Sequence, residues 1–569
     1  MTSQWSSRRV GGTDWREPAG ETAILYLTAG LALAGGSFWA ASSLAAWTAT
    51  GHWPHYTMSA TIAAIAHFAA HPADPLGAWP RPPGTNRSTG TVIFYLVAGL
   101  LAGALLGLAG TAARRARSGQ PKAVTGARWA RPSERRSLRV RRSGSAGRVV
   151  IGRPLAGRGL VATEARHSLL VIGPTQSGKT TGLAVPAILE WSGPVVATSV
   201  KDDLAAASIS WRSGSGPCWV FDPTVSAGSG PPRSRWSPLS ACRSWSAAQK
   251  MASWLVESTP GRSGLADAAF WYSAAAKQLA PLLLAAERGG LAVADVVRWT
   301  DTEEFDEPRC LLQLSGEDEA VMALQACAAR DERIRSSVTT TLETVLAPFA
   351  DPLVARATAA TDIDLPALLS GSGTLYLCGP SHEQARVQGL FAALVSTVIA
   401  TAVSEVGRSG RPLEPPLLVV LDEAANIAPI RDLDTLASTA AGLGIQLVTV
   451  CQDLSQLAAR YGQERARTIA NNHRAKLLLS GVGDLQTLDL VSGLAGEQAV
   501  REESTTQDLR TGGRSRSVST RIRRLAPTDE LRRVAPGEGV LVYGHLPPMR
   551  LRLRPWYRDR ELRARGAAY

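Results

Sequence analysis

A single stretch, LLVIGPTQSGKTT from Leu169 to Thr181, limits what this chain can fold into more than any other. An apolar run leads into glycine, four residues, glycine, lysine and threonine, and a helix-like segment follows, which is the order that a phosphate-binding loop requires. In such a loop the backbone N–H groups converge on phosphates at the positive end of a helix. The alternative is a glycine-rich turn between strand and helix that carries an exposed lysine.

The loop predicts that the chain binds ATP together with Mg²⁺. Lys179 is expected to reach the outer phosphates, where it also serves catalysis, and the Thr180 hydroxyl is expected to bind the metal. The residues expected to bind the nucleotide are Gly173, Pro174, Thr175, Gln176, Ser177, Gly178, Lys179, Thr180 and Thr181.

A second apolar run, LLVVLDE from Leu417 to Glu423, ends in two carboxylates. It is typical of a buried parallel strand that brings Asp422 and Glu423 to the carboxyl edge of a sheet. We expect Asp422 to hold the magnesium through water and Glu423 to polarise the attacking water. The alternative is that the pair caps the amino terminus of a helix after a buried strand.

Gln452 ends the next expected strand, IQLVTVCQD from Ile445 to Asp453. This position would allow its amide to sense the γ-phosphate or the attacking water. A capping amide at the end of a strand explains the same position equally well.

The charge balance favours anionic partners. The chain has 61 Lys and Arg against 48 Asp and Glu, a net charge of +13, so nucleic acid and lipid headgroups are the expected partner classes. Six scattered cysteines without C-x-x-C spacing are typical of reduced thiols rather than of a metal cluster.

Two uncharged segments near the amino terminus, Thr22–Trp47 and Ser88–Ala113, each exceed the roughly 20 residues that cross a bilayer core. Buried alanine-rich helices, or a signal peptide for the first segment, are the alternatives. A run of positive charge follows the second segment and places both termini in the cytoplasm. These residues are Arg114, Arg115, Arg117, Lys122, Arg128 and Arg131.

The loop between the two segments, about residues 48–87, is then expected outside the membrane. It contains His52, His55, His67 and His71. His67 and His71 would share a helix face and could bind a metal, but we prefer solvated loop histidines because no carboxylate or cysteine pattern completes a site.

From Val149 onward strand-like and helix-like segments alternate, which predicts a parallel sheet covered on both faces. Residues 241–350 are almost wholly helix-like and are expected to form an inserted all-α domain. The expected organisation is a cytoplasmic amino terminus (1–21), a transmembrane region (22–113), a basic linker (114–148), a nucleotide-binding domain in two parts (149–240 and 351–500) and a basic carboxyl-terminal segment that returns to the sheet (501–569). Within the last segment, Arg501–Arg524 is expected to be a mobile basic loop.

Several motifs in one order resemble the TraG/TraD family of type IV secretion coupling proteins. They are GARWARPSE (126–134), GPTQSGKT, SVKDDL (199–204), VFDPT followed by WSPL, FWYSAAAKQL, LDEAANIAPI (421–430), GLGIQLVTVCQDLSQLAARYG (442–462) and LPPMRLRLRPWY (546–557). The chain departs from the family at Ser199, where Asp is usual, and at Ser237, where Asn is usual. The first departure puts a carboxylate role at that turn in doubt, whereas Lys201 and Asp203 still match.

The resemblance implies an α/β fold: a RecA-like P-loop sheet with an inserted all-α domain, preceded by two transmembrane helices. It implies a multi-pass protein of the bacterial inner membrane with a cytoplasmic ATPase domain that assembles as a homo-hexamer. The partners would be single-stranded DNA carrying a relaxase and the components of a type IV secretion channel, with the helical insertion receiving the substrate.

Two other readings of the same motifs remain. One is a double-stranded DNA translocase of the FtsK/HerA kind, and the other is a non-motor protein that docks substrates and uses ATP only to assemble. Arg431 and Arg467 are hypotheses for the arginine that reaches a neighbour's γ-phosphate.

Overall fold

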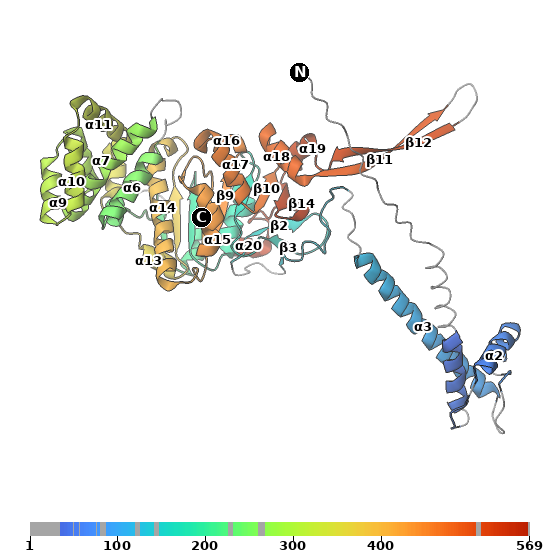
Figure 1. Ribbon diagram of the computed structural model, residues 1–569. Coiled ribbons are helices and arrows are strands. Elements are labelled where there is room, and N and C mark those ends of the chain that lie inside the picture. Colours follow the sequence, from blue (N-terminus) through green and yellow to red (C-terminus); the bar gives the residue numbers. More distant parts are fainter. Residues whose placement is uncertain are drawn as a thin grey trace, which may run out of the picture. The chain divides into compact units, whose positions relative to one another are not determined.

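The computed structural model describes residues 35–48, 51–55, 57–75, 77–79, 87–119, 126–140, 147–225, 231–259, 268–507 and 514–566. The chain divides into two compact units, which we name the amino-terminal unit (residues 1–124) and the main unit (residues 125–569). Figure 1 shows both units.

The amino-terminal unit contains a helix over residues 35–48, α2 (Met58–Ala70) and α3 (Arg87–Gly119). A small aromatic cluster holds them together, because the Phe38 ring lies 5.4 Å from both the Phe68 ring and the Phe94 ring. The expected external loop is not wholly a loop, since α2 accounts for 13 of its residues.

The expectation of solvated loop histidines is wrong for His67. This residue lies on α2, its ring stacks on His71 with centroids 4.9 Å apart, and its Nε2 atom is buried. In the part of the chain that the structure describes, no group of three or more His, Cys, Asp or Glu side chains could hold a metal ion.

One helix among the described residues is long and apolar enough to cross a membrane, and it is α14 (Gln384–Ser409). It belongs to the main unit, where 67% of its apolar window is buried and Phe391 and Leu394 join the hydrophobic core. Within α3, the apolar stretch Gly90–Leu105 is shorter, and the first half of the first expected span, residues 22–34, lies outside the described residues. The two transmembrane helices remain predictions.

The main unit is built on a sheet of 12 strands in the order β1-β3-β2-β14-β13-β10-β4-β9-β8-β5-β7-β6. The strands from β10 to β6 run parallel: β10 (Ala475–Leu479), β4 (Leu169–Ile172), β9 (Ile445–Cys451), β8 (Leu417–Leu421), β5 (Val195–Ser199), β7 (Thr374–Cys378) and β6 (Cys218–Phe221). Antiparallel strands extend the sheet beyond β10: β13 (Glu538–Tyr543), β14 (Leu546–Arg552), β2 (Val150–Pro154), β3 (Leu160–Ala162) and β1 (Arg139–Val140). The predicted parallel sheet is thus one side of a mixed sheet, from β10 to the edge strand β6.

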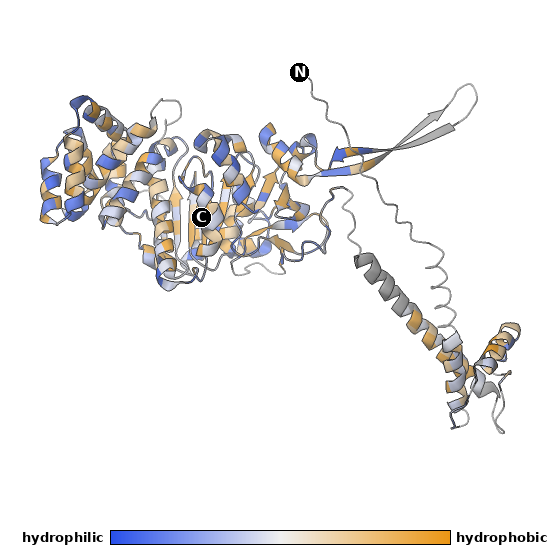
Figure 2. Ribbon diagram, viewed as in Figure 1, coloured by the Kyte–Doolittle hydropathy of each residue, from blue (hydrophilic) through white to orange (hydrophobic). Residues whose placement is uncertain are grey.

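The parallel strands are apolar along their length because both faces are covered. In β8, Leu417, Val419 and Leu421 belong to one hydrophobic cluster, whereas Leu418 and Val420 belong to the other. Helices α4 (Val185–Glu190) and α5 (Asp203–Ser213) cover the second face. Figure 2 shows the strands as a hydrophobic layer beneath helices of mixed polarity.

Between β6 and β7 the regular elements of the described residues are all helical. They are η2 (Pro238–Ala241), α6 (Trp245–Glu257), α7 (Ala268–Arg288), α8 (Val293–Asp301), α9 (Asp306–Leu314), α10 (Asp318–Ala328), α11 (Glu332–Leu346), η3 (Ala347–Ala350), α12 (Pro352–Thr358) and α13 (Leu365–Ser370). Leu255, Leu283 and Leu342 share one hydrophobic cluster with the first face of the sheet. An inserted domain with a function of its own therefore remains a prediction.

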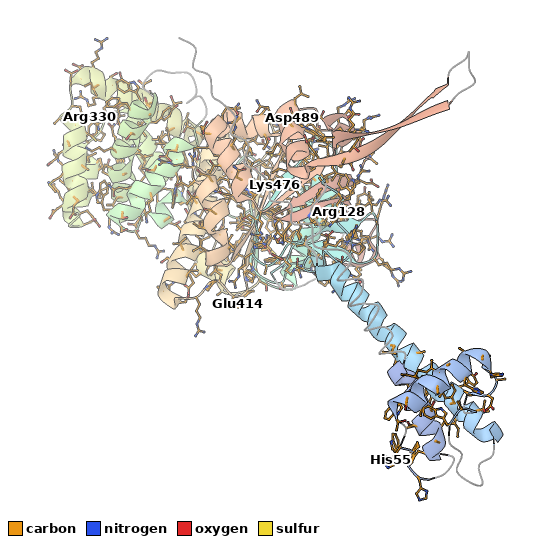
Figure 3. All side chains as sticks on the ribbon, turned by 45° about the vertical axis from the view of Figure 1, so that its right-hand side comes forward. His55, Arg128, Arg330, Glu414, Lys476 and Asp489 are labelled. Atoms are coloured by element: carbon orange, nitrogen blue, oxygen red, sulfur yellow. The ribbon has the colours of Figure 1, made fainter. Side chains whose placement is uncertain are left out.

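Two segments differ from their predicted structure. Residues 126–140, expected in the basic linker, belong to the main unit, where Arg128 (Figure 3) donates to Glu134 at 2.7 Å and holds the pKa of that carboxyl at about 2. In the expected mobile loop Arg501–Arg524, residues 501–507 and 514–524 lie in two paired antiparallel strands, β11 (Glu497–Gln507) and β12 (Arg514–Arg524). Low apolar content misled the prediction, because an antiparallel ladder satisfies backbone groups whatever the side chains are.

A buried histidine joins the centre of the sheet to α17 (Gln463–Asn472). The His473 Nδ1–H donates to the Ile469 carbonyl at 2.7 Å, and Nε2 therefore accepts from the Thr449 hydroxyl at 2.8 Å. Burial lowers the pKa of His473 to about 4, so the ring is neutral in the folded chain.

We expect the folded chain to lose stability as the pH falls from about 6.5 towards 4, because only the unfolded chain then binds a proton at His473. This histidine alone would change the free energy of unfolding by about 1.4 kcal/mol for each pH unit in that window. His473→Gln keeps a donor and an acceptor but does not titrate, so its melting temperature should depend less steeply on pH. Equal slopes for both proteins would contradict the assignment.

Candidate nucleotide-binding site

The predicted loop follows β4 and bends back over the end of that strand. Gln176 and Gly178 take left-handed backbone conformations, with φ of 62° and 87°. At Gly173 a Cβ atom would lie 2.7 Å from Ser177 Oγ and 2.9 Å from Leu479 Cβ, so only glycine fits there. Gly173 is thus required by the close approach of the loop to itself and to β10, whereas Gly178 is favoured by its left-handed backbone.

The Lys179 ammonium and the Ser177 hydroxyl are buried polar groups of the loop that could bind an anion. Lys179 is 7% exposed, and its ammonium donates to the Gly173 carbonyl at 2.7 Å. The Ser177 hydroxyl is buried and, among the described residues, has no hydrogen-bond partner. Buried polar groups are rarely left unpaired, so this hydroxyl, together with backbone N–H groups of the loop, fits a phosphate.

The strand order brings the two motifs together. β9 lies between β4 and β8, and the Thr180 hydroxyl donates to Asp422 Oδ2 at 2.9 Å although the two residues are 242 positions apart. Burial raises the pKa of Asp422 to about 6, against the opposing effects of Thr180 and Lys179. Its Oδ1 atom is buried with no hydrogen-bond partner in the described part of the chain. A hydroxyl beside a carboxylate with an open oxygen fits Mg²⁺.

Glu423 occupies a strained position beside Asp422. Its backbone is left-handed, with φ of 54°, and its half-buried carboxylate accepts from Asn426 Nδ2 at 3.4 Å. Strain of this kind persists where the surrounding structure holds it, often at functional sites. The helix-cap alternative fails, because the next helix, α15 (Leu433–Leu443), begins ten residues later.

Gln452 lies next to the start of the phosphate-binding loop, since the carbonyl of Cys451 accepts from the Gly173 N–H at 3.1 Å. The helix that follows, α16 (Leu454–Tyr461), is capped by Asp453. The capping alternative for Gln452 therefore has no support, and its role as a sensor remains a prediction.

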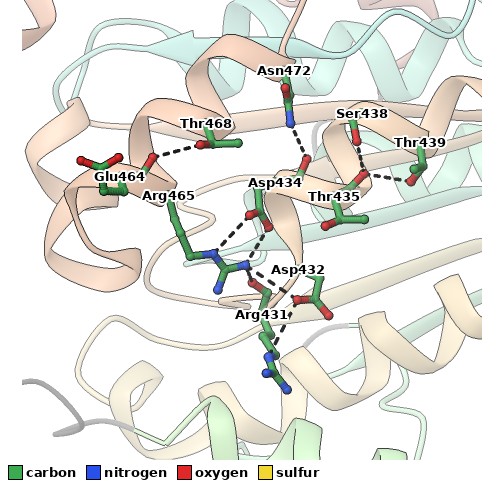
Figure 4. Close-up of polar contacts among 10 residues, drawn as sticks. All are labelled: Arg431, Asp432, Asp434, Thr435, Ser438, Thr439, Glu464, Arg465, Thr468 and Asn472. Carbon is green, nitrogen blue, oxygen red and sulfur yellow. Dashed lines mark hydrogen bonds and ion pairs between the residues drawn. The ribbon is translucent and has the colours of Figure 1, made fainter.

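The two arginines suggested for a neighbour's γ-phosphate differ in their surroundings. Arg431 is half-exposed and forms an ion pair with Glu257, and it lies in the network of Figure 4, where Arg465 binds Asp434 at 2.7 Å. Arg467 is exposed on α17. Both remain hypotheses.

Sequence reasoning gave Asp203 no part in the phosphate chemistry. Its carboxylate accepts from the Ser199 hydroxyl at 2.9 Å, and its charge contributes to the raised pKa of Asp422. The motif SVKDDL identified Asp203 as a family position but did not indicate that its charge acts on Asp422. The serine that replaces the usual aspartate is thus a hydrogen-bond donor to Asp203.

A phosphate-binding loop, and a carboxylate brought to it across a parallel sheet, define a P-loop nucleotide-binding fold. The family model described as "Type IV secretory system Conjugative DNA transfer" matches residues 133–569, and the chain belongs to this family. The resemblance found in the motifs is confirmed.

Curated relatives include the conjugal transfer protein TraG of Escherichia coli, which is 28% identical over 392 residues, or 62% of this chain and 59% of the relative. The protein VirD4 of Rhizobium rhizogenes is 25% identical over 425 residues, or 72% of this chain and 61% of the relative. The chain thus spans about three fifths of the length of these relatives.

Solved structures show the same fold. The unbound conjugative coupling protein TrwBdeltaN70 has a TM-score of 0.58 at 20% identity, covering 75% of this chain and 92% of its own. TrwB in complex with ADP and Mg²⁺ has a TM-score of 0.56 at 19% identity, covering 76% and 93%.

Proposed function

We propose that this chain is a membrane-anchored coupling ATPase of a type IV secretion or conjugation system. It binds ATP at the phosphate-binding loop and uses hydrolysis to move single-stranded DNA, delivered by a bound relaxase, into the secretion channel. The hydrogen bond from Thr180 to Asp422 carries the ATPase part of the proposal, because it joins the two motifs into one site.

Each residue of the site has a separate task in this proposal. Lys179 moves from the Gly173 carbonyl to the outer phosphates, and the Ser177 hydroxyl and the loop N–H groups bind phosphate oxygens. Thr180 and Asp422 hold Mg²⁺, which when bound neutralises phosphate charge. Solved TrwB complexes with ADPNP and with ADP and Mg²⁺ support these ligands for a protein of the same fold.

Glu423 is proposed to accept a proton from the attacking water, and Gln452 to orient that water or the γ-phosphate. Glu423 follows β8 and Gln452 follows the neighbouring strand β9. Both therefore lie at the edge of the sheet where the phosphate-binding loop lies. Either Arg431 or Arg467 would complete the site of a neighbouring subunit in a homo-hexamer.

The partners and the location are proposals of the same kind. The net charge of +13 and the family to which the chain belongs support DNA as the translocated substrate. The uncharged segments Thr22–Trp47 and Ser88–Ala113, followed by positive charge, support two spans of the bacterial inner membrane with the ATPase inside. The helical segment between β6 and β7 is proposed to receive the relaxase-bound substrate.

The test is hydrolysis by the full chain with and without DNA. We expect single-stranded DNA to stimulate hydrolysis, with little dependence on its sequence, because a translocation pore contacts phosphates rather than base edges. Raising salt from 50 to 200 mM should weaken DNA binding on the order of tenfold or more.

Each other outcome selects a different function. Stimulation only by duplex DNA of the same sequence would favour a double-stranded DNA translocase. Tight ATP binding with no DNA-stimulated turnover would favour a non-motor docking protein. A DNA affinity that does not depend on salt would contradict a channel that binds phosphates.

A further inference from the structure

The first turn of the helix after the phosphate-binding loop leaves two carbonyls without their usual partners. Residues Thr180–Ala184 form a π-turn in which the Val185 N–H bonds to the Thr180 carbonyl. In an α-helix the Val185 N–H would instead donate to the Thr181 carbonyl. The Gly182 carbonyl would be served by residue 186, which is a proline and has no N–H.

A segment near the carboxyl terminus supplies the missing donors. The Trp556 N–H donates to the Thr181 carbonyl at 3.0 Å, and the Arg554 N–H donates to the Gly182 carbonyl at 3.4 Å. More than 370 positions separate donors from acceptors. The π-turn, the proline and the distant segment thus form one hydrogen-bonded arrangement.

Within the same segment, the Leu553 side chain packs against Gly182 in the first turn of the helix and against Gly178 in the loop. A Cβ atom at Gly182 would lie 3.0 Å from Leu553 Cβ and 3.2 Å from its Cδ1 atom. At Gly178, inside the loop, a Cβ atom would lie 3.5 Å from Leu553 Cδ1. A larger residue than glycine at position 182 would therefore force Leu553 or the helix to move.

The segment also holds the far end of this helix. The Arg554 side chain is 3% exposed, and its guanidinium binds Glu190, the last residue of α4, at 2.7 Å and Asp559 at 3.0 Å. Arg565 donates to the Leu189 carbonyl at 3.2 Å. Contacts at the loop, at the first turn and at the last turn leave the helix little freedom to shift or rotate.

We propose that residues 553–556 are a positioning element of the nucleotide site. They hold the phosphate-binding loop and the first turn of its helix in the conformation that receives phosphates. The inference rests on the nucleotide binding proposed above. It follows because a loop that binds through backbone N–H groups works only if those groups already point at the ligand.

The test is a double-mutant cycle on the full chain, with affinity for a non-hydrolysable ATP analogue and Mg²⁺ as the readout. Leu553→Ala and Gly182→Ala should each weaken binding of the analogue about tenfold. Leu553→Ala removes the packing of Leu553 against Gly182, and Gly182→Ala adds a methyl group that the packing has no room for. The double variant should lose less than the product of the two losses, since the shorter side chain makes room for the new methyl group.

Met549→Ala is the matched control. Met549 is a buried residue of β14, the strand that leads into the segment, and its loss should lower the melting temperature while changing nucleotide affinity less than twofold. If Leu553→Ala does not fold, Leu553→Val can be compared with Met549→Leu in the same way.

The experiment distinguishes failure of the proposed nucleotide binding from failure of the positioning role. An unaltered chain that does not bind the analogue would overturn the proposed function itself. A chain that binds it, with Leu553→Ala behaving like Met549→Ala or with the two losses multiplying, would overturn only the positioning role.

Discussion

Replacing Glu423 by glutamine should lower ATP hydrolysis on the order of 10²-fold or more while nucleotide and magnesium binding persist. Glutamine keeps the size and hydrogen-bonding reach of the side chain, so the contact from Asn426 can remain. The charge that would accept a proton from water is lost. Steady-state hydrolysis and nucleotide affinity, measured on the same protein, separate the two effects.

A carboxylate with no part in the site provides the control. Glu414 lies in the segment before β8, with 84% of its side chain exposed, so Glu414→Gln should hydrolyse ATP at the unaltered rate. A Glu423→Gln protein that turns over near that rate would remove Glu423 from catalysis. Asp422 and Gln452 would then be the remaining candidates at this edge of the sheet.

Removing the Lys179 ammonium should reduce nucleotide binding as well as hydrolysis, unlike the change at Glu423. Lys179→Ala should weaken ATP binding about 10- to 100-fold, the usual worth of a hydrogen-bonded charge on a charged ligand. Part of the loss is indirect, because the Lys179 charge also lowers the pKa of Asp422, and its removal would disfavour the ionised carboxylate that is proposed to hold Mg²⁺. Hydrolysis would fall together with affinity.

The control for this variant is Lys250→Ala, which removes an exposed lysine of α6 and should leave ATP affinity unchanged. The comparison of Lys179→Ala with Glu423→Gln is informative because one residue is expected to act on binding and the other on turnover. If Lys179→Ala bound ATP with unaltered affinity, the loop would not be the phosphate site.

Local elements of the site could be predicted from the residues alone. The run LLVI before the glycines and the run LLVVLDE form β4 and β8 as expected, because buried parallel strands are uniformly apolar and the residues after them are not. The two motifs were also expected to meet, and the Thr180 hydroxyl does donate to Asp422, whereas the chemical roles of Lys179, Thr180 and Asp422 stay predictions. Composition predicted a mobile loop for Arg501–Arg524, but pairing of the backbone forms strands at residues 501–507 and 514–524.

What the sequence by itself determined about this protein is therefore its local geometry and its family: a glycine loop between strand and helix, a carboxylate at the end of a buried strand, and motifs in a recognisable order. The tertiary structure alone decided which distant segments meet. It put β9 between the two motifs, turned Glu423 into a left-handed conformation, and brought Trp556 onto the Thr181 carbonyl. The physical reason is the separation along the chain of the residues that interact. Strand and turn preferences depend on neighbouring residues, whereas a hydrogen bond between positions hundreds of residues apart depends on how a whole core packs.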